Sequence, residues 1–236
     1  MALKGRATAR PLSAKRFFNR ISFFCALRPA TKLTPRPERR KINPYDRIGI
    51  LMMNRDAGTP PPLRYLDGEA ERRALVEDIQ WVRQVVLDIA QSVPQDRWYE
   101  PRYHGWTLAA MLAHLHNSDN LALLLIKVSL LGFRPAVSEA TLNWINNRTA
   151  HYFRKRLIPT TLVDIRKNEK TITDFIVRLP MDKFTKLVYH PTIGEYLTVE
   201  RAMQEYFLNH WHLHLLTLQK GEGIYDEPPT AGADMV

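Results

Sequence analysis

Cysteine is almost absent from this 236-residue chain, which contains only Cys25. A disulfide within the chain is therefore excluded, and so is a zinc site built from several cysteine thiolates. Long apolar runs are absent as well: the longest, residues 121–131, is interrupted by Lys127 and is shorter than the ~18 residues that a membrane span needs. Apolar residues nevertheless make up 45% of the chain, enough for a folded core. We therefore expect a folded protein that does not cross a membrane.

Acidic residues are nearly missing from the first 41 residues, which hold twelve Lys and Arg against Glu38 alone. The rest of the chain holds 22 basic and 23 acidic residues, so the net charge of +10 arises from this leader. A nearly neutral remainder gives no support to a nucleic-acid-binding surface on the folded part. We therefore expect no nucleic-acid partner.

The leader, residues 1–62, is rich in proline and lacks helical or strand periodicity, so we expect it to be disordered. An acid-poor, Arg-rich N-terminus is typical of an organelle transit peptide, whereas the apolar stretch Ile21–Leu27 is short for a secretory signal. Two alternatives stay open: an upstream extension in front of a start at Met52 or Met53, and a functional basic arm. Unless the leader directs import into an organelle, we expect a cytoplasmic protein.

From Glu69 onward, apolar residues recur with helical spacing. The expected helices are Glu69–Ser92, Thr107–Leu131, Glu139–Arg156, Thr161–Leu179 and Tyr196–Lys220. Prolines follow three of these helices and Gly221 follows the last, as helix-ending residues do. No stretch alternates long enough to predict a strand. The sequence thus predicts an all-α four-helix bundle with one extra short connecting helix over residues 63–221, and a flexible tail over 222–236.

Two histidines on the last expected helix share its apolar face. At ~100° per residue, His210 and His214 lie about 40° apart, whereas His212 lies on the opposite face. Imidazoles at positions i and i+4 can converge on one metal ion. On the second helix the same construction places His114 at the edge of the apolar stripe and His116 outside it. His114, His210 and His214 therefore form a candidate three-His metal site, and separately hydrogen-bonded core histidines remain the alternative.

Several short motifs, taken in order, resemble the DinB/YfiT-like superfamily of four-helix-bundle proteins. They are Gly105-Trp106-Thr107, Leu112-Ala-His114-Leu115, the stretch Pro191–Glu200 and His210-x-x-x-His214. Members of that superfamily often have Glu where Ala110 stands, a difference that concerns helix capping. The resemblance implies a divalent metal ion, zinc or nickel, held by His114, His210 and His214. It also implies a homodimer.

The superfamily includes transferases that use low-molecular-weight thiols. The resemblance therefore implies a metal-dependent enzyme that activates a thiol cosubstrate or water, as a thiol-S-transferase or hydrolase acting on a small-molecule substrate. Tyr206, one turn before His210, is a candidate catalytic hydrogen-bond donor, with an ordinary core tyrosine as the alternative. Asp119 is a candidate to orient a histidine ligand, with a surface carboxylate as the alternative. The alternative function is a non-catalytic metal- or small-molecule-binding stress-response protein.

Overall fold

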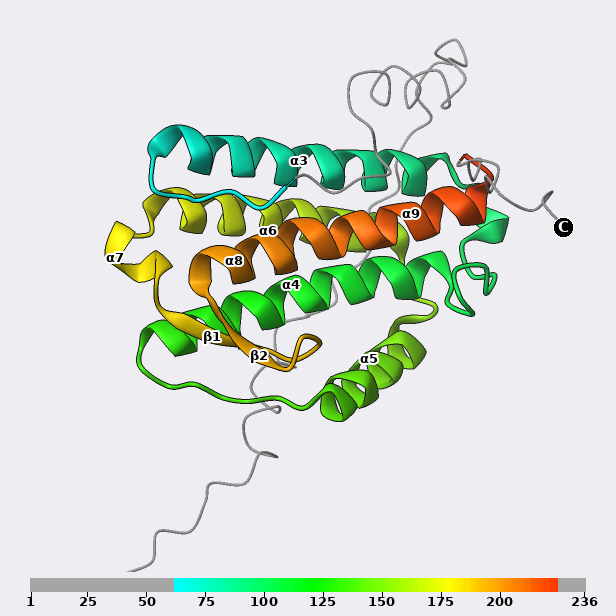
Figure 1. Ribbon diagram of the computed structural model, residues 1–236. Coiled ribbons are helices and arrows are strands. Elements are labelled where there is room, and N and C mark those ends of the chain that lie inside the picture. Colours follow the sequence, from blue (N-terminus) through cyan, green and yellow to red (C-terminus); the bar gives the residue numbers. More distant parts are fainter. Residues whose placement is uncertain (1–61, 225–236) are drawn as a thin grey trace, which may run out of the picture. The chain divides into compact units, whose positions relative to one another are not determined.

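The computed structural model describes residues 62–224, so the predictions for the basic leader and for nearly all of the C-terminal tail lie outside the described residues. Four helical rods form a bundle (Figure 1). They are α3 (Glu69–Ser92), α4 (Leu108–Leu130), α6 (Ile158–Arg178) and a last rod made of α8 (Val199–Gln204), the π-helical turn η2 (Glu205–Asn209) and α9 (His210–Glu222). The predicted four-helix bundle is confirmed, and α5 (Glu139–Phe153) is the extra connecting helix.

The consecutive helices α3 and α4 lie diagonally across the bundle. Each packs against α6 and against the last rod, which lies in front of α6 in Figure 1. The connection between them, residues 93–107, contains the short 3-10 turn η1 (Gln95–Arg97). Buried leucine, isoleucine and valine side chains fill the space between the rods, where apolar burial supplies the main stabilising term. No helix within residues 62–224 combines the length and apolar character needed to cross a bilayer.

Local sequence explains where several helices begin and end. Thr107 accepts a hydrogen bond at 3.1 Å from the backbone N–H three residues further on and so caps α4. Ser138 caps α5 and Thr198 caps α8 with the same contact. At the C-terminal end of α9 the left-handed residue is Gly223, with φ 68°, and not the predicted Gly221.

The predicted boundary around Pro159 is wrong. We expected this proline to follow the third helix and the fourth to begin at Thr161, but α5 already ends at Phe153 and α6 begins at Ile158. Pro159 therefore lies in the first turn of α6. A proline is tolerated there because backbone N–H groups of the first turn have no partner within the helix.

A two-stranded antiparallel sheet was not expected from the sequence. It consists of β1 (Leu187–His190) and β2 (Glu195–Thr198), which follow the short helix α7 (Met181–Phe184). Tyr196, predicted as the first residue of the last helix, lies in β2 instead. Strands of four residues are too short for an alternation of apolar and polar residues to be recognised. The turn between the two strands contains Gly194, with φ 77°. The sheet packs beside α4.

Candidate metal centre

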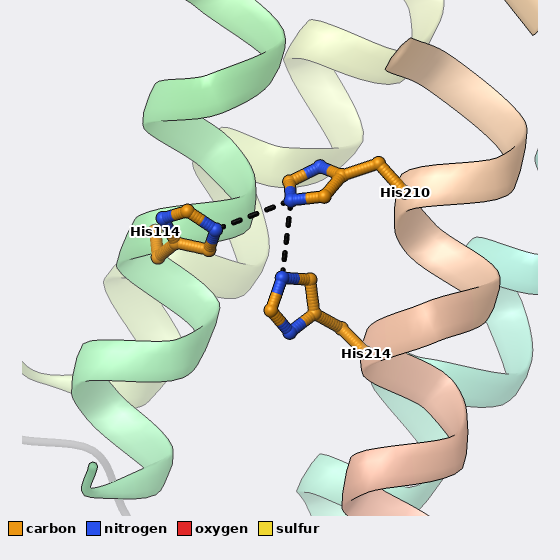
Figure 2. Close-up of side chains that lie close together, drawn as sticks. All are labelled: His114, His210 and His214. Atoms are coloured by element: carbon orange, nitrogen blue, oxygen red, sulfur yellow. Dashed lines mark hydrogen bonds between the residues drawn. The ribbon is translucent and has the colours of Figure 1, made fainter. Parts of the chain in front are cut away.

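Three histidines from two rods point into the same space (Figure 2). Nε2 of His210, on α9, lies 3.2 Å from Nε2 of His114, on α4. The same atom lies 3.0 Å from Nε2 of His214, one turn further along α9. A ring nitrogen of each histidine lies within 4.8 Å of those of the other two. The structure thus brings together the three histidines that the sequence singled out.

The distances between these nitrogens fit a single divalent ion. Imidazole nitrogens bind zinc at ~2.0–2.1 Å, so two of them lie ~2.9–3.4 Å apart when the angle at the ion is ~90–110°. Both Nε2–Nε2 distances, 3.0 and 3.2 Å, fall in this range. Imidazole donors suit zinc and nickel. The residues present therefore fit a metal ion with three imidazole ligands.

The surroundings of the three rings favour their neutral form. Burial lowers the pKa of His114 to about 4. Burial also lowers the pKa of His214 to about 3, helped by positive charge on His114 and His104. The pKa of His210 is lowered well below its usual value by burial and by charge on His214 and His114. At neutral pH each ring therefore keeps a free lone pair, which is the form that binds a metal ion.

The π-helical turn η2 immediately precedes His210, whose backbone N–H donates to the carbonyl of Glu205. Such turns are rare and occur frequently at functional sites. Arg83, a fully buried residue of α3, supports the turn by donating to the carbonyl oxygen of Phe207 at 2.9 Å. Arg83 is not predicted from the sequence, because an arginine on an amphipathic helix is ordinarily exposed.

Asp119 is buried and does not orient a histidine ligand. Its carboxylate accepts a hydrogen bond from Arg83 at 2.9 Å and another from the indole N–H of Trp211 at 3.0 Å. Burial raises the pKa of Asp119, and the neighbouring guanidinium of Arg83 opposes that rise. Because Trp211 follows His210 directly, Asp119 and Arg83 hold the segment of the last rod that carries this candidate ligand.

The hydroxyl of Tyr206 is already engaged in a structural contact. It donates to the carbonyl oxygen of Tyr189 at 3.1 Å and so links η2 to β1. Its ring stacks on His190 with centroids 4.5 Å apart, and burial raises its pKa. His190, which the sequence analysis missed, is buried and accepts from the N–H of Ile193 at 3.2 Å. The only sequence signal was its position directly before the stretch Pro191–Glu200.

The prediction that His212 faces outward is wrong. Its side chain is 3% exposed and packs against Trp81 of α3, with ring centroids 5.8 Å apart. The rod packs against α3 as well as α4, so more than one of its faces is covered. The next residue, Leu213, is 64% exposed and lies on the open face. His116 lies outside the three-His cluster and contacts Asn120 instead.

A tight turn places Trp106 against His114. His104 at φ 51° and Gly105 at φ 84° are its two central residues, and Tyr103 and Trp106 pair on either side. Two consecutive left-handed residues are typical of a type I′ turn. The indole ring lies edge-on to the imidazole of His114, with ring centroids 5.0 Å apart. Trp106 therefore covers one side of the candidate site.

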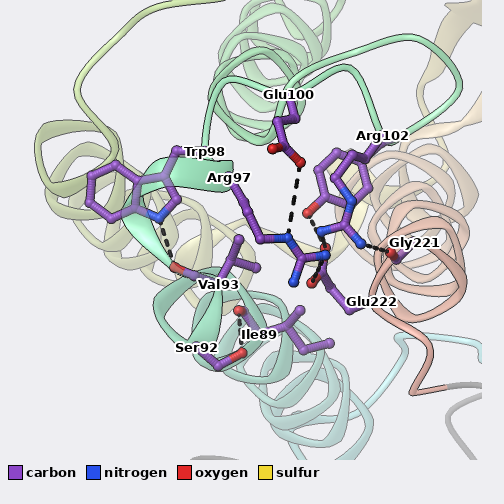
Figure 3. A network of polar contacts seen from close by, with 10 residues as sticks. Ile89, Ser92, Val93, Arg97, Trp98, Glu100, Arg102, Gly221 and Glu222 are labelled. Carbon is purple, nitrogen blue, oxygen red and sulfur yellow. Dashed lines mark hydrogen bonds and ion pairs between the residues drawn. The ribbon is translucent and has the colours of Figure 1, made fainter.

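A network of polar contacts fixes this connection to the end of α9 (Figure 3). The carboxylate of Glu222 accepts hydrogen bonds from Arg102 at 2.7 Å and from the hydroxyl of Tyr103 at 2.6 Å. Arg97 lies 3.6 Å from the same carboxylate, and Arg102 also donates to the carbonyl of Gly221. The side chain of Glu222 is almost completely buried. The turn that carries Trp106 is thus held against the helix that carries two of the candidate ligands.

Comparisons with protein-family models and with curated protein sequences find no match. Among solved structures, the chain is similar to YfiT from Bacillus subtilis, described as a probable metal-dependent hydrolase with an unusual four-helix bundle topology. The TM-score is 0.54 and the sequence identity 18%, over 70% of this chain and 94% of YfiT. The fold is therefore of the DinB/YfiT type, as the sequence motifs predicted.

Proposed function

We propose that this protein is a divalent-metal-dependent hydrolase of a small-molecule substrate, with His114, His210 and His214 as ligands of zinc or nickel. The convergence of three imidazole nitrogens, from the buried His114 and the half-buried His210 and His214, in their neutral form carries this proposal. A divalent ion with three imidazole ligands keeps an open coordination position, where as a Lewis acid it lowers the pKa of bound water or thiol.

Residues around the ligands orient them. Oγ of Ser118 lies 3.4 Å from Nδ1 of His114, so that nitrogen can donate its hydrogen while Nε2 faces the cluster. Trp106 packs edge-on against the same imidazole. Arg83 and Asp119 hold the backbone around His210. These contacts orient the ring of His114 and fix the backbone that carries His210.

Water is the nucleophile that we favour. The described residues contain no cysteine, so this part of the chain supplies no thiol of its own. The structural neighbour YfiT is described as a probable hydrolase, which supports the same choice. Transfer of a group from the substrate to a low-molecular-weight thiol is the competing reaction.

The test uses the full-length chain without an affinity tag, loaded with zinc or nickel, and a panel of chromogenic esters and amides. We expect metal-dependent hydrolysis without added thiol, lost in His210→Ala and retained in His116→Ala, the matched control on α4. Product that forms only with a low-molecular-weight thiol would replace the hydrolase with a transferase. Stoichiometric metal without turnover by either route would favour the non-catalytic binding protein.

A further inference from the structure

A cavity of about 560 Å³ opens between the beginning of α4 and the end of α5, and none of the three candidate metal ligands lines it. Its walls come from the connection before α4, the first turn of α4, the C-terminal half of α5 and the two residues that follow α5. Tyr99 and Trp106 supply aromatic surface, while Ala110 and Ala150 leave room between the two helices. A volume in this range is typical of small-molecule sites.

The charged side chains that line the cavity are all basic. Its lining includes His151, Arg154 and Lys155 and contains no acidic side chain. Arg156, the next residue, is paired with Asp164 at 2.6 Å. Arg154 and Lys155, in contrast, form no ion pair within residues 62–224, although both are exposed. Two adjacent cations thus remain available to a ligand.

The backbone of Arg154 is fixed relative to α4. The hydroxyl of Thr107, the N-cap of α4, donates to the backbone carbonyl of Arg154 at 3.0 Å. This bond joins the residue after the end of α5 to the beginning of α4. The backbone that carries Arg154 therefore has a defined position beside the cavity.

The cavity adjoins the candidate metal ligands through two residues. Ala110 lines it and precedes His114 by one helical turn, a rise of ~6 Å. Trp106 also lines it and contacts the imidazole of His114 with ring centroids 5.0 Å apart. A molecule bound in the cavity would therefore lie close to His114.

We propose that this cavity is the subsite for the substrate of the proposed hydrolase, and that the substrate is an organic acid. Its carboxylate pairs with Arg154 and Lys155, since guanidinium and ammonium groups form charge-assisted hydrogen bonds with carboxylates. Its planar or apolar body lies against Trp106 and Tyr99, where aromatic faces provide contact area. The substrate class rests on the proposed function, whereas the binding of a carboxylate depends only on the cavity.

The test measures binding rather than turnover, by ligand-observed NMR on the full-length protein in metal-free and zinc-loaded forms. The probes are 3-phenylpropionate and its neutral analogue 3-phenylpropionamide. We expect the carboxylate to bind more tightly than the amide in both forms. The double variant Arg154→Gln/Lys155→Gln should lower carboxylate affinity by about tenfold and leave amide affinity unchanged.

The matched control is Arg148→Gln/Lys167→Gln, which removes the same charge from two exposed residues outside the cavity. The control should keep the affinity of the wild type. Equal affinity for the two probes, an equal loss in the control, or carboxylate binding that needs zinc would overturn the proposal. A chain that binds no zinc but retains the Arg154- and Lys155-dependent preference would refute the hydrolase and leave the cavity assignment in place.

Discussion

The guanidinium of Arg83 donates a hydrogen bond at 2.9 Å to the backbone carbonyl of Phe207, inside the π-helical turn that precedes His210. The same guanidinium donates to the carboxylate of Asp119 at 2.9 Å and lies 4.4 Å over the ring of Trp211. One buried side chain of α3 therefore joins α4 and the last rod beside the candidate metal centre. Changes at Arg83 or Asp119 should consequently affect both folding and the geometry of the ligands.

Asp119→Ala should lower the free energy of unfolding by about 3–5 kcal/mol, because it leaves the buried guanidinium of Arg83 without its carboxylate. Urea denaturation of the metal-free protein measures this effect. Asp174→Ala is the control, since its ion pair with Lys170 is largely exposed and should contribute less than about 1 kcal/mol. Equal losses in the two variants would contradict the structural role of the buried pair.

Arg83→Lys should weaken metal binding by about tenfold or more while the protein stays folded. Lysine keeps the positive charge but lacks the planar fork that reaches the Phe207 carbonyl and Asp119 together. Competition with a chromogenic chelator gives the zinc affinity. Arg166→Lys, an exposed change on α6, should leave that affinity unchanged. An affinity in Arg83→Lys equal to that of wild type would show that the π-helical turn needs no support from Arg83.

The free energy of unfolding of the metal-free protein should fall as the pH drops from about 6.5 to about 4. In the folded chain the pKa of His114 is about 4 and that of His214 about 3, whereas an exposed imidazole titrates near 6.5. As the pH falls, the unfolded chain therefore takes up protons before the folded chain does. This lowers the free energy of unfolding, by about 3 kcal/mol for His114 alone.

Urea denaturation between pH 7 and pH 5 tests this dependence. The comparison is the double variant His114→Gln/His214→Gln, which lacks both imidazoles and should lose less stability over the same interval. Parallel curves for the two proteins would mean that the folded state does not depress these pKa values.

Tyr206→Phe separates a structural from a catalytic role. The hydroxyl donates to the Tyr189 carbonyl, so we expect a loss of about 1 kcal/mol in stability. Zinc stoichiometry should be unchanged, and hydrolysis should change by less than about twofold. A fall in rate of about 100-fold at unchanged zinc content would instead assign the hydroxyl to proton transfer or substrate binding.

Helical periodicity predicted the bundle and selected His114 over His116, because apolar residues recur at every turn on the buried face of a long amphipathic helix. The same method misplaced His212, since it assumes a single buried face and constant rotation. The last rod meets neither condition, because it packs against both α3 and α4 and contains a π-helical turn. No local sequence pattern predicts such a π-helical turn. The turn is stabilised by a hydrogen bond from Arg83, which lies more than a hundred residues earlier in the chain.

Contacts between distant segments also explain the other differences. The sequence predicts a ligand-orienting or a surface role for Asp119, because its neighbours along the chain do not reveal the contacts with Arg83 and Trp211. The strands β1 and β2 form only by pairing with each other, and each is too short to be recognised alone. The homodimer, the cytoplasmic location and the identity of the metal stay predictions.

Metal content is the most direct test of the central claim. Elemental analysis of the untagged full-length protein, purified without chelator and then reconstituted with zinc or nickel, should give about one metal ion per chain. His114→Ala, His210→Ala and His214→Ala should each lose most of it, whereas His116→Ala should retain it. Wild-type protein that stays metal-free after reconstitution, or retention of metal in all three variants, would contradict the three-His centre.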